Sequence, residues 1–172
     1  MGSPTELSMV APVSGRVVPL ADVPDPVFAQ EIVGPGLAIE PLVPTAPGEL
    51  HTSLVDDVDG VVVAPVAGTV ASLFPHAFAI ETADGRTVLV HLGIDTVTLK
   101  GAGFGALVAA GDQVVVGQHM LTWDPAAVAA GGLATVCPVI ALQEDPGQVE
   151  LLVGAGTLVR RGDPLLRWLA PR

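Results

Sequence analysis

Two histidines, His76 and His91, offer the most reactive chemistry in this sequence, and both lie in short apolar runs, residues 75–81 and 87–95. The runs are joined by residues 82–86, which contain Asp84-Gly85, a dipeptide typical of two-residue β-hairpin turns. With that turn, Phe78 pairs with His91, and His76 is the diagonal neighbour of His91 on the same face. The pattern therefore predicts two imidazoles that converge on an apolar surface.

A lone histidine in an apolar strand is usually a packed core residue, but two on one face favour a function. The pair could hold a metal ion with a third ligand from elsewhere, or one histidine could be a general base. One could also be a nucleophile that accepts a group whose charge the other stabilises. Imidazole has an ordinary pKa of about 6.5, and a half-buried apolar setting keeps it neutral. From these residues alone, the alternatives stay open.

Other chemistries lack their motifs. The sequence has no Gly-x-Ser-x-Gly, no glycine-rich phosphate-binding motif and no His-Glu-x-x-His. Cys137, the only cysteine, is predicted to be a buried structural thiol. Lys100, the only lysine, lacks the neighbours of a biotin or lipoate attachment site. His51 and His119 match no site, and we expect them to be solvated.

Composition favours short strands. Half of the 172 residues are hydrophobic, only 3% are aromatic, and glycine, valine and proline abound, which predicts an all-β domain over residues 1–172 with two or three short helices. The net charge of −11 argues against a nucleic-acid partner. Proline and glycine interrupt the apolar stretch 61–80, so we expect no direct membrane insertion. A single cysteine and the lack of a signal-peptide pattern predict a cytoplasmic protein.

Two short motifs occur twice. Ala-Pro-Val-x-Gly-x-Val occupies residues 11–17 and 64–70, and Val-x-x-Gly-x-x-(Met/Leu) occupies 114–120 and 159–165. Two copies of the first motif followed by two of the second predict pseudo-symmetric halves that interlock. Residues 41–60, rich in proline and aspartate, are predicted to be an exposed inserted loop. We further expect a strand over 95–99 and one or two helical turns over 104–110.

The segment from His91 to Val97, His-Leu-Gly-Ile-Asp-Thr-Val, resembles the active-site signature of the glucose-type IIA component of the bacterial phosphoenolpyruvate:sugar phosphotransferase system. Similar segments follow in order over nearly the whole chain apart from residues 41–60 and the two ends: 11–15, 23–28, 33–39, 64–68, 76–78, 99–104 and 137–139. The resemblance implies an antiparallel β-sandwich with an interlocked internal duplication, known as the duplicated hybrid motif.

The resemblance also implies roles for the site. His91 would accept a phosphoryl group on its tele nitrogen from the phosphohistidine of HPr and pass it to a cysteine of the IIB domain of a membrane sugar permease. His76 would stabilise the phosphoryl oxygens, with Asp95 and Thr96 in support. No cofactor is required, although zinc could bind His76 and His91 at an interface with a regulatory target. A non-catalytic regulatory binding module is the main alternative.

An apolar docking surface around the histidines is implied as well. Its matching positions are Val27, Phe28, Ile32, Val33, Phe74, Phe78, Leu89 and Val97. The sequence departs from many relatives where Phe74-Pro75 precedes His76, because those relatives carry a threonine two residues before the first histidine. We expect backbone carbonyls or Thr96 to supply the orienting contact instead.

Overall fold

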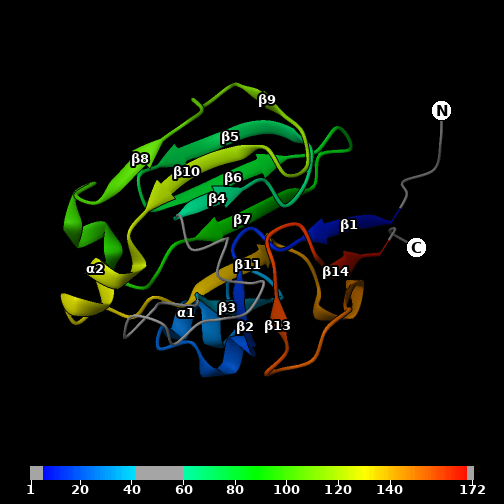
Figure 1. Ribbon diagram of the computed structural model, residues 1–172. Helices are drawn as coiled ribbons and strands as arrows, with labels where there is room; N and C mark the ends of the chain where they lie inside the picture. Colours follow the sequence, from blue (N-terminus) through cyan, green and yellow to red (C-terminus); the bar gives the residue numbers. More distant parts are fainter. Residues whose placement is uncertain (1–5, 42–59, 170–172) are drawn as a thin grey trace.

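The computed structural model describes residues 6–41 and 60–169, and strands dominate this part of the chain (Figure 1). The strands are β1 (Leu7–Val10), β2 (Gly15–Val18), β3 (Gly36–Pro41), β4 (Val61–Val63), β5 (Gly68–Phe74), β6 (Ala77–Glu81), β7 (Thr87–His91), β8 (Phe104–Ala106), β9 (Gln113–Val114), β10 (His119–Trp123), β11 (Cys137–Ala141), β12 (Val149–Leu151), β13 (Leu158–Val159) and β14 (Pro164–Trp168). The helices are α1 (Pro26–Ala29), α2 (Pro125–Ala130) and the 3-10 segments η1 (Leu20–Asp22), η3 (Thr96–Leu99) and η4 (Pro146–Gln148). The predicted all-β class is confirmed.

The strands form one large antiparallel sheet and two small ones. The large sheet has the order β13-β2-β3-β11-β7-β6-β5-β9, and the small sheets are β1-β14-β12 and β4-β10-β8. One main apolar core joins all three, because Phe78, Leu121 and Leu166 come from different sheets and are all fully buried in it. This arrangement is the predicted β-sandwich, which buries alternate side chains of each strand between layers.

The repeated motifs occupy equivalent places. Gly15, in the first copy of the first motif, pairs with Val159, and Gly68, in the second copy, pairs with Val114. Both valines begin copies of the second motif. Each copy of the first motif therefore pairs with a copy of the second, and the internal duplication is confirmed.

The glycine of the first motif is required by close backbone approach. A Cβ atom on Gly15 would overlap the carbonyl oxygen of Glu40, and one on Gly68 would overlap that of Glu81. The two clashes are equivalent in the two halves. In both repeats, therefore, a glycine is needed because a backbone carbonyl of the neighbouring strand lies too close for a side chain.

The halves interlock through reciprocal hydrogen bonds. The N–H of Val10 donates to the carbonyl of Pro65, and the N–H of Val63 donates to that of Pro12, both at 3.0 Å. In the chain, the unit β4–β10 lies between β3 and β11 of the other unit, and each unit contributes four strands to the large sheet. The halves are therefore nested rather than consecutive, as the motif order predicted.

A second, smaller apolar cluster lies on the other face of the large sheet. Ala38 and Ile140 belong to it, whereas their strand neighbours Leu37 and Val139 belong to the main core. Phe28 of α1 covers this cluster. The cluster packs against one face of β7 and β11. His91 of the candidate site is the last residue of β7.

Two local expectations were wrong. Residues 96–99 form η3 rather than a strand, because Asp95 adopts a left-handed conformation with φ +62° and starts a tight turn. Residues 104–106 form β8, which pairs with β10, rather than a helix. In both places, tertiary pairing outweighs the short local pattern.

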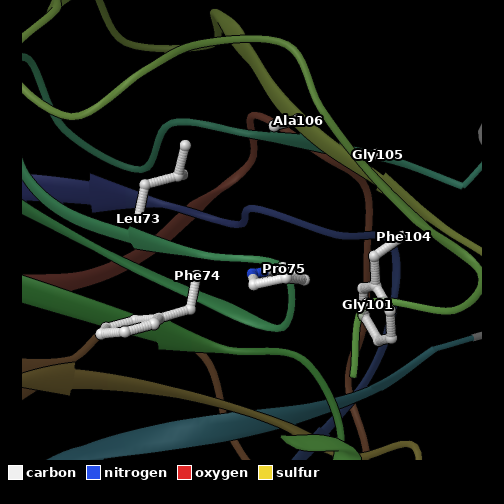
Figure 2. A pocket seen from close by; sticks show the side chains of 7 residues that line it. All are labelled: Leu73, Phe74, Pro75, Gly101, Phe104, Gly105 and Ala106. Atoms are coloured by element: carbon white, nitrogen blue, oxygen red, sulfur yellow. The ribbon is translucent and has the colours of Figure 1, made fainter. Parts of the chain in front are cut away.

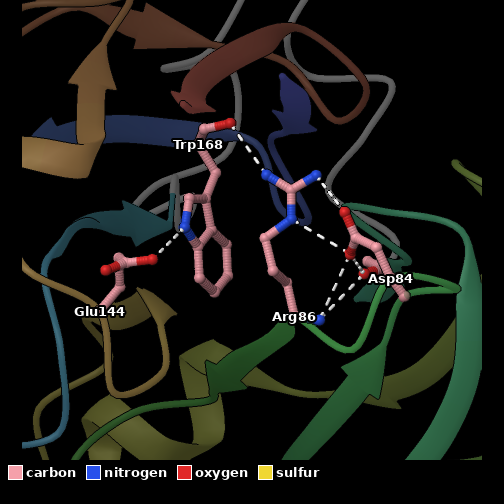
Figure 3. Close-up of polar contacts among 5 residues, drawn as sticks. Asp84, Arg86, Glu144 and Trp168 are labelled. Atoms are coloured by element: carbon pink, nitrogen blue, oxygen red, sulfur yellow. Dashed lines mark hydrogen bonds and ion pairs between the residues drawn. The ribbon is translucent and has the colours of Figure 1, made fainter. Parts of the chain in front are cut away.

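Arg86 anchors the β6–β7 hairpin to the last strand (Figure 3). Its guanidinium lies 2.6 Å from the Asp84 carboxylate, donates to the carbonyl of Trp168 at 3.2 Å and lies 5.5 Å from the Trp168 ring centroid. The Trp168 indole N–H donates to Glu144 at 2.9 Å. These contacts fix the end of the hairpin that lies away from the histidines.

The expected loop 41–60 and His51 lie mostly outside the described residues. β3 continues through Pro41, so the expected loop 41–60 begins one residue too early, and residues 42–59, with His51, lie outside the described residues. Among the described helices, none has the length and apolar character needed to cross a bilayer.

Candidate functional site

The hairpin that carries His91 has a different register from the expected one. β6 and β7 pair Ala77 with His91 and Phe78 with Val90. The turn has three residues, 83–85, because the N–H of Thr82 donates to the carbonyl of Arg86 at 2.8 Å. Gly85 occupies its left-handed position, with φ +89°. Turns of this kind add one residue to the loop and shift the pairing by one.

The shift changes which side chains share a face. Phe78 is fully buried in the main core, so the prediction that it lines the docking surface is wrong. Leu89 does share the face of His91, two residues away on β7, where it is half-buried against the smaller cluster. A one-residue change of register exchanges the two faces of a strand.

His76 lies in the turn between β5 and β6 rather than within a strand. Its carbonyl accepts a hydrogen bond from the N–H of Leu92 at 2.7 Å, which joins the turn to the end of β7. The imidazole rings of His76 and His91 have centroids 5.1 Å apart and an interplanar angle of 71°. The structure therefore brings the two histidines together, although the expected register was wrong.

The tautomer of His91 follows from its hydrogen bond. Its Nδ1 lies 2.6 Å from the carbonyl oxygen of Gly93. A carbonyl can only accept, so Nδ1 carries the proton, and in the neutral ring Nε2 carries the free lone pair. Gly93 has φ +74°, and a Cβ there would lie 2.8 Å from the carbonyl oxygen of Ala134.

Thr96 and Asp95 support the loop that follows His91. The buried Thr96 hydroxyl donates to the carbonyl of Leu92 at 2.6 Å, and the Asp95 carbonyl accepts from the Thr98 hydroxyl at 2.7 Å. Thr96 therefore holds the loop that presents the Gly93 carbonyl. The Asp95 side chain is exposed at the rim.

Burial and nearby charges set the protonation of the pair. Desolvation lowers the pKa of His91, while the Gly93 carbonyl and the charges of Asp25 and Asp95 act in the opposite direction. Burial, and then the charge of His91, lowers the pKa of His76. Both rings are thus neutral near pH 7, and neutral imidazole is the nucleophilic form.

Sequence reasoning did not identify Asp25 as a neighbour of the site. Its side chain caps α1 by accepting a hydrogen bond from the N–H of Val27 at 2.9 Å. The sequence could have indicated this neighbour, because Asp25 directly precedes α1, the helix that contains Phe28. The Phe28 ring contacts the His91 ring, with centroids 5.3 Å apart. The Asp25 carboxylate therefore caps α1 and also contributes a negative charge that acts on the His91 imidazole.

The remaining expected docking residues divide by exposure. Phe28 is buried at 6%, and Val33 is half-buried. The four well-exposed ones are Val27 (41%), Ile32 (64%), Phe74 (55%) and Val97 (60%). The Phe74 ring lies 6.0 Å from the His76 ring, tilted by 35°, so an aromatic ring contact precedes the first histidine of the site.

Other candidate groups lie outside the histidine pair. Within residues 6–41 and 60–169, no three or more His, Cys, Asp or Glu side chains are grouped to hold a metal ion, so zinc at the histidine pair would need ligands from a partner and stays a prediction. Cys137 is fully buried, and burial raises the pKa of its thiol. His119 is exposed at the start of β10.

Comparisons with known proteins agree with this geometry. Residues 7–146 match the family described as phosphoenolpyruvate-dependent sugar phosphotransferase system, EIIA 1. A PTS system glucose-specific EIIA component of Halalkalibacterium halodurans is 41% identical over 145 residues, which cover 83% of this chain and 75% of that protein. An N-acetylglucosamine-specific EIICBA component of Klebsiella pneumoniae is 37% identical over 160 residues, which cover 92% of this chain and 22% of that larger protein.

A solved structure shares the fold. Glucose permease IIA from Mycoplasma capricolum superposes with a TM-score of 0.78 at 30% identity, over 95% of this chain and 96% of that one. Fold and site together define a IIA-type β-sandwich with two adjoining histidines. The chain belongs to the EIIA 1 family of the phosphoenolpyruvate-dependent sugar phosphotransferase system, whose glucose-specific members are phosphocarriers.

Proposed function

We propose that this chain carries a phosphoryl group on Nε2 of His91, accepted from phospho-HPr and delivered to the cysteine of a IIB domain. The observation that supports this most strongly is the hydrogen bond from Nδ1 of His91 to the Gly93 carbonyl. It fixes the ring and leaves Nε2 as the nucleophilic nitrogen. Among the chemistries open to a histidine pair, this one needs no third ligand and no added cofactor.

The exchange is a pair of in-line displacements. The lone pair of Nε2 forms a bond to phosphorus while the P–N bond of the donor breaks, and that electron pair returns to the donor imidazole. In the second step, the IIB thiolate attacks phosphorus, and the electron pair of the P–Nε2 bond returns to His91. The Gly93 carbonyl keeps the Nδ1 proton in place throughout, so His91 leaves the cycle as it entered. Positioning supplies most of the catalysis in such transfers.

His76 is proposed to stabilise the transferred group. Its ring adjoins that of His91 at 5.1 Å between centroids, so an N–H of His76 can donate to a phosphoryl oxygen. A donor aimed at developing negative charge accelerates transfer. The carboxylates of Asp25 and Asp95 act on the charge of His91 and favour departure of the phosphoryl group by repulsion.

The exposed apolar residues are proposed as the docking surface for both partners. Val27, Ile32, Phe74 and Val97 are all more than 40% exposed. Exposed apolar side chains beside a reactive group suit transient contact with several proteins. The N-acetylglucosamine-specific EIICBA relative combines a B part with its A part, as its name states. We place the exchange with such a IIB domain in the cytoplasm.

The test uses the purified chain with phosphoenolpyruvate, enzyme I and HPr. We expect an acid-labile mass increase of one phosphoryl group in the wild type and in His76→Ala, and none in His91→Ala. His119→Ala is the matched control, because it removes an exposed imidazole away from the site. Absence of the adduct from the wild type with active partners would overturn the proposal, and its presence in His91→Ala would overturn the assignment.

A further inference from the structure

The two histidines of the site have different supports. His76 directly follows Phe74 and Pro75, which line an apolar pocket of about 190 Å³ (Figure 2). His91 is the last residue of β7, which pairs with β11, and residues 135–137, where β11 begins, are all buried. The segment before His76 therefore borders an open space, whereas the loop after His91 can rest on a packed segment.

The peptide group that follows Gly93 links this packed segment to the imidazole. The carbonyl of Gly93 accepts a hydrogen bond from Nδ1 of His91 at 2.6 Å. On the other side of the same peptide group, the N–H of Ile94 donates to the carbonyl of Ala134 at 3.0 Å. Because a peptide group is planar and rigid, the contact with Ala134 helps to aim the Gly93 carbonyl at the ring.

The peptide group that precedes Gly93 is held by two side chains. Its carbonyl, from Leu92, accepts from the Thr96 hydroxyl at 2.6 Å. Its N–H, from Gly93, donates to Sγ of Cys137. The Cys137 thiol in turn donates to the carbonyl of Thr135 at 3.3 Å. A thiol is both a weak donor and a weak acceptor, so one sulfur atom serves both contacts.

Burial keeps the Cys137 thiol in the form that these contacts need. The side chain is fully buried, and burial raises the pKa of its thiol, so the thiol stays protonated and donates to Thr135. The Thr135 hydroxyl donates to the Glu40 carboxylate on β3, which fixes the position of Thr135. A chain of hydrogen bonds therefore runs from β3 through Cys137 to the imidazole of His91, and buried hydrogen bonds in a chain strengthen one another.

We propose that Cys137 is a positioning residue for phosphoryl transfer, because its thiol holds the Gly93 N–H and so fixes the carbonyl that keeps the Nδ1 proton of His91. Transfer depends on accurate placement of the attacking atom. A displaced carbonyl would deprive the ring of the acceptor that fixes its tautomer and its orientation. The part of this proposal that concerns transfer rests on the proposed phosphocarrier function, whereas the effect on the ring is measured without any partner.

The test compares Cys137→Ala with Cys137→Ser. Alanine removes both hydrogen bonds of the thiol, whereas a serine hydroxyl can still accept from Gly93 and donate to Thr135. In Cys137→Ala, we expect the ring nitrogen shifts of His91 to report a mixture of tautomers and the Gly93 amide proton to exchange faster with water. We expect kcat for transfer from phospho-HPr to fall about tenfold, or ~1.4 kcal/mol for one lost hydrogen bond, with little change in KM. Cys137→Ser should restore kcat and both signals.

Val159→Ala is the control for a general loss of packing. It removes buried atoms from β13, three strands away from β11 in the large sheet, so it should lower stability and leave kcat and the His91 signals unchanged. An unchanged His91 ring in folded Cys137→Ala, or equal losses of kcat in the alanine and serine variants, would overturn the proposal. If the wild type forms no phosphohistidine while the ring signals change in Cys137→Ala, the link from Cys137 to His91 stands and the phosphocarrier function fails.

A measurement on the wild type keeps the proposal testable should Cys137→Ala fail to fold. The Gly93 amide proton should show a nuclear Overhauser contact with the β protons of Cys137 and should exchange slowly with water. A Gly93 amide that exchanges freely and shows no such contact would contradict the proposal.

Discussion

Nδ1 of His91 lies 2.6 Å from the carbonyl oxygen of Gly93. This contact gives the two nitrogens of one imidazole different tasks, since Nδ1 keeps its proton and Nε2 keeps its lone pair. The loop that presents the carbonyl is itself held by the Thr96 hydroxyl on the Leu92 carbonyl. The reactivity of His91 therefore depends on backbone geometry as much as on its neighbouring side chains.

Gly93→Ala should disturb this geometry. Its φ of +74° disfavours a side chain, and the added Cβ would lie 2.7 Å from Cγ2 of Thr96. We expect a loss of about 1–3 kcal/mol in the free energy of unfolding and a mixture of tautomers at His91. Nitrogen chemical shifts of the His91 ring measure the tautomer, and a ring that stays wholly protonated at Nδ1 in the folded variant would contradict the account.

His76→Gln should separate acceptance from delivery. Glutamine can still donate to a phosphoryl oxygen but cannot adopt the imidazole geometry beside His91. We expect His91 to be phosphorylated in this variant and the transfer to IIB to slow by about 10²-fold, the loss typical of one misplaced donor. Single-turnover transfer from the phosphorylated variant measures the step, and a wild-type rate would show that His76 has no stabilising role.

Asp95→Asn should lower the pKa of His91. The Asp95 charge raises that pKa, and asparagine removes the charge while tolerating the left-handed backbone at this residue. Asp25→Asn should act in the same direction, and asparagine is also a good helix cap for α1. The His91 proton signals followed against pH report the change, which the account requires to be downward in both variants.

The sequence predicted the pair of histidines correctly but for a partly wrong reason. The expected two-residue turn placed Phe78 opposite His91, whereas the Thr82 hydroxyl bonds to Asp84 and the three-residue turn pairs Ala77 with His91. The rings still meet because His76 lies in a turn, where side chains do not follow strand alternation. Turn length depends on such side-chain contacts, which a dipeptide preference does not contain.

The fold was easier to predict than its local details. The repeated motifs predicted the internal duplication, and the equivalent pairings of Gly15 with Val159 and of Gly68 with Val114 confirm it. Asp25 was missed as a neighbour of His91, because residues far apart in the sequence meet only through the packing of α1 on the sheet. Long-range charge contacts of this kind leave no local pattern.

Stability should fall with acid partly through His91. Burial lowers its pKa in the folded state below the unfolded value of about 6.5. At pH values between the folded-state and unfolded-state pKa of His91, the unfolded chain binds more protons than the folded chain. The free energy of unfolding therefore rises with pH in this range. The contribution is complete above about pH 6.5 and is lost as the pH falls toward the lowered pKa.

Urea unfolding of the wild type and His91→Gln at about pH 7.5 and about pH 5.5 measures this effect. The variant lacks the titrating ring, so its loss of stability on acidification should be smaller than that of the wild type. Equal losses would show that other groups account for the pH dependence.

Arg86→Met should destabilise the fold without affecting the transfer chemistry. The Arg86 side chain is 11% exposed, and its removal breaks the Asp84 ion pair and the bond to the Trp168 carbonyl. We expect a loss of about 2 kcal/mol, the usual scale for a buried charged hydrogen bond. Arg160→Met, at an exposed turn residue, should cost far less in the same denaturation experiment, and equal losses would argue against the anchor.

The nitrogen that carries the phosphoryl group tests the central claim most directly. The chain is phosphorylated with phosphoenolpyruvate, enzyme I and HPr, and phosphorus–nitrogen couplings of the labelled His91 ring identify the bonded atom. We predict attachment at Nε2, with Nδ1 still protonated toward Gly93. Attachment at Nδ1, or on a residue other than His91, would contradict the account.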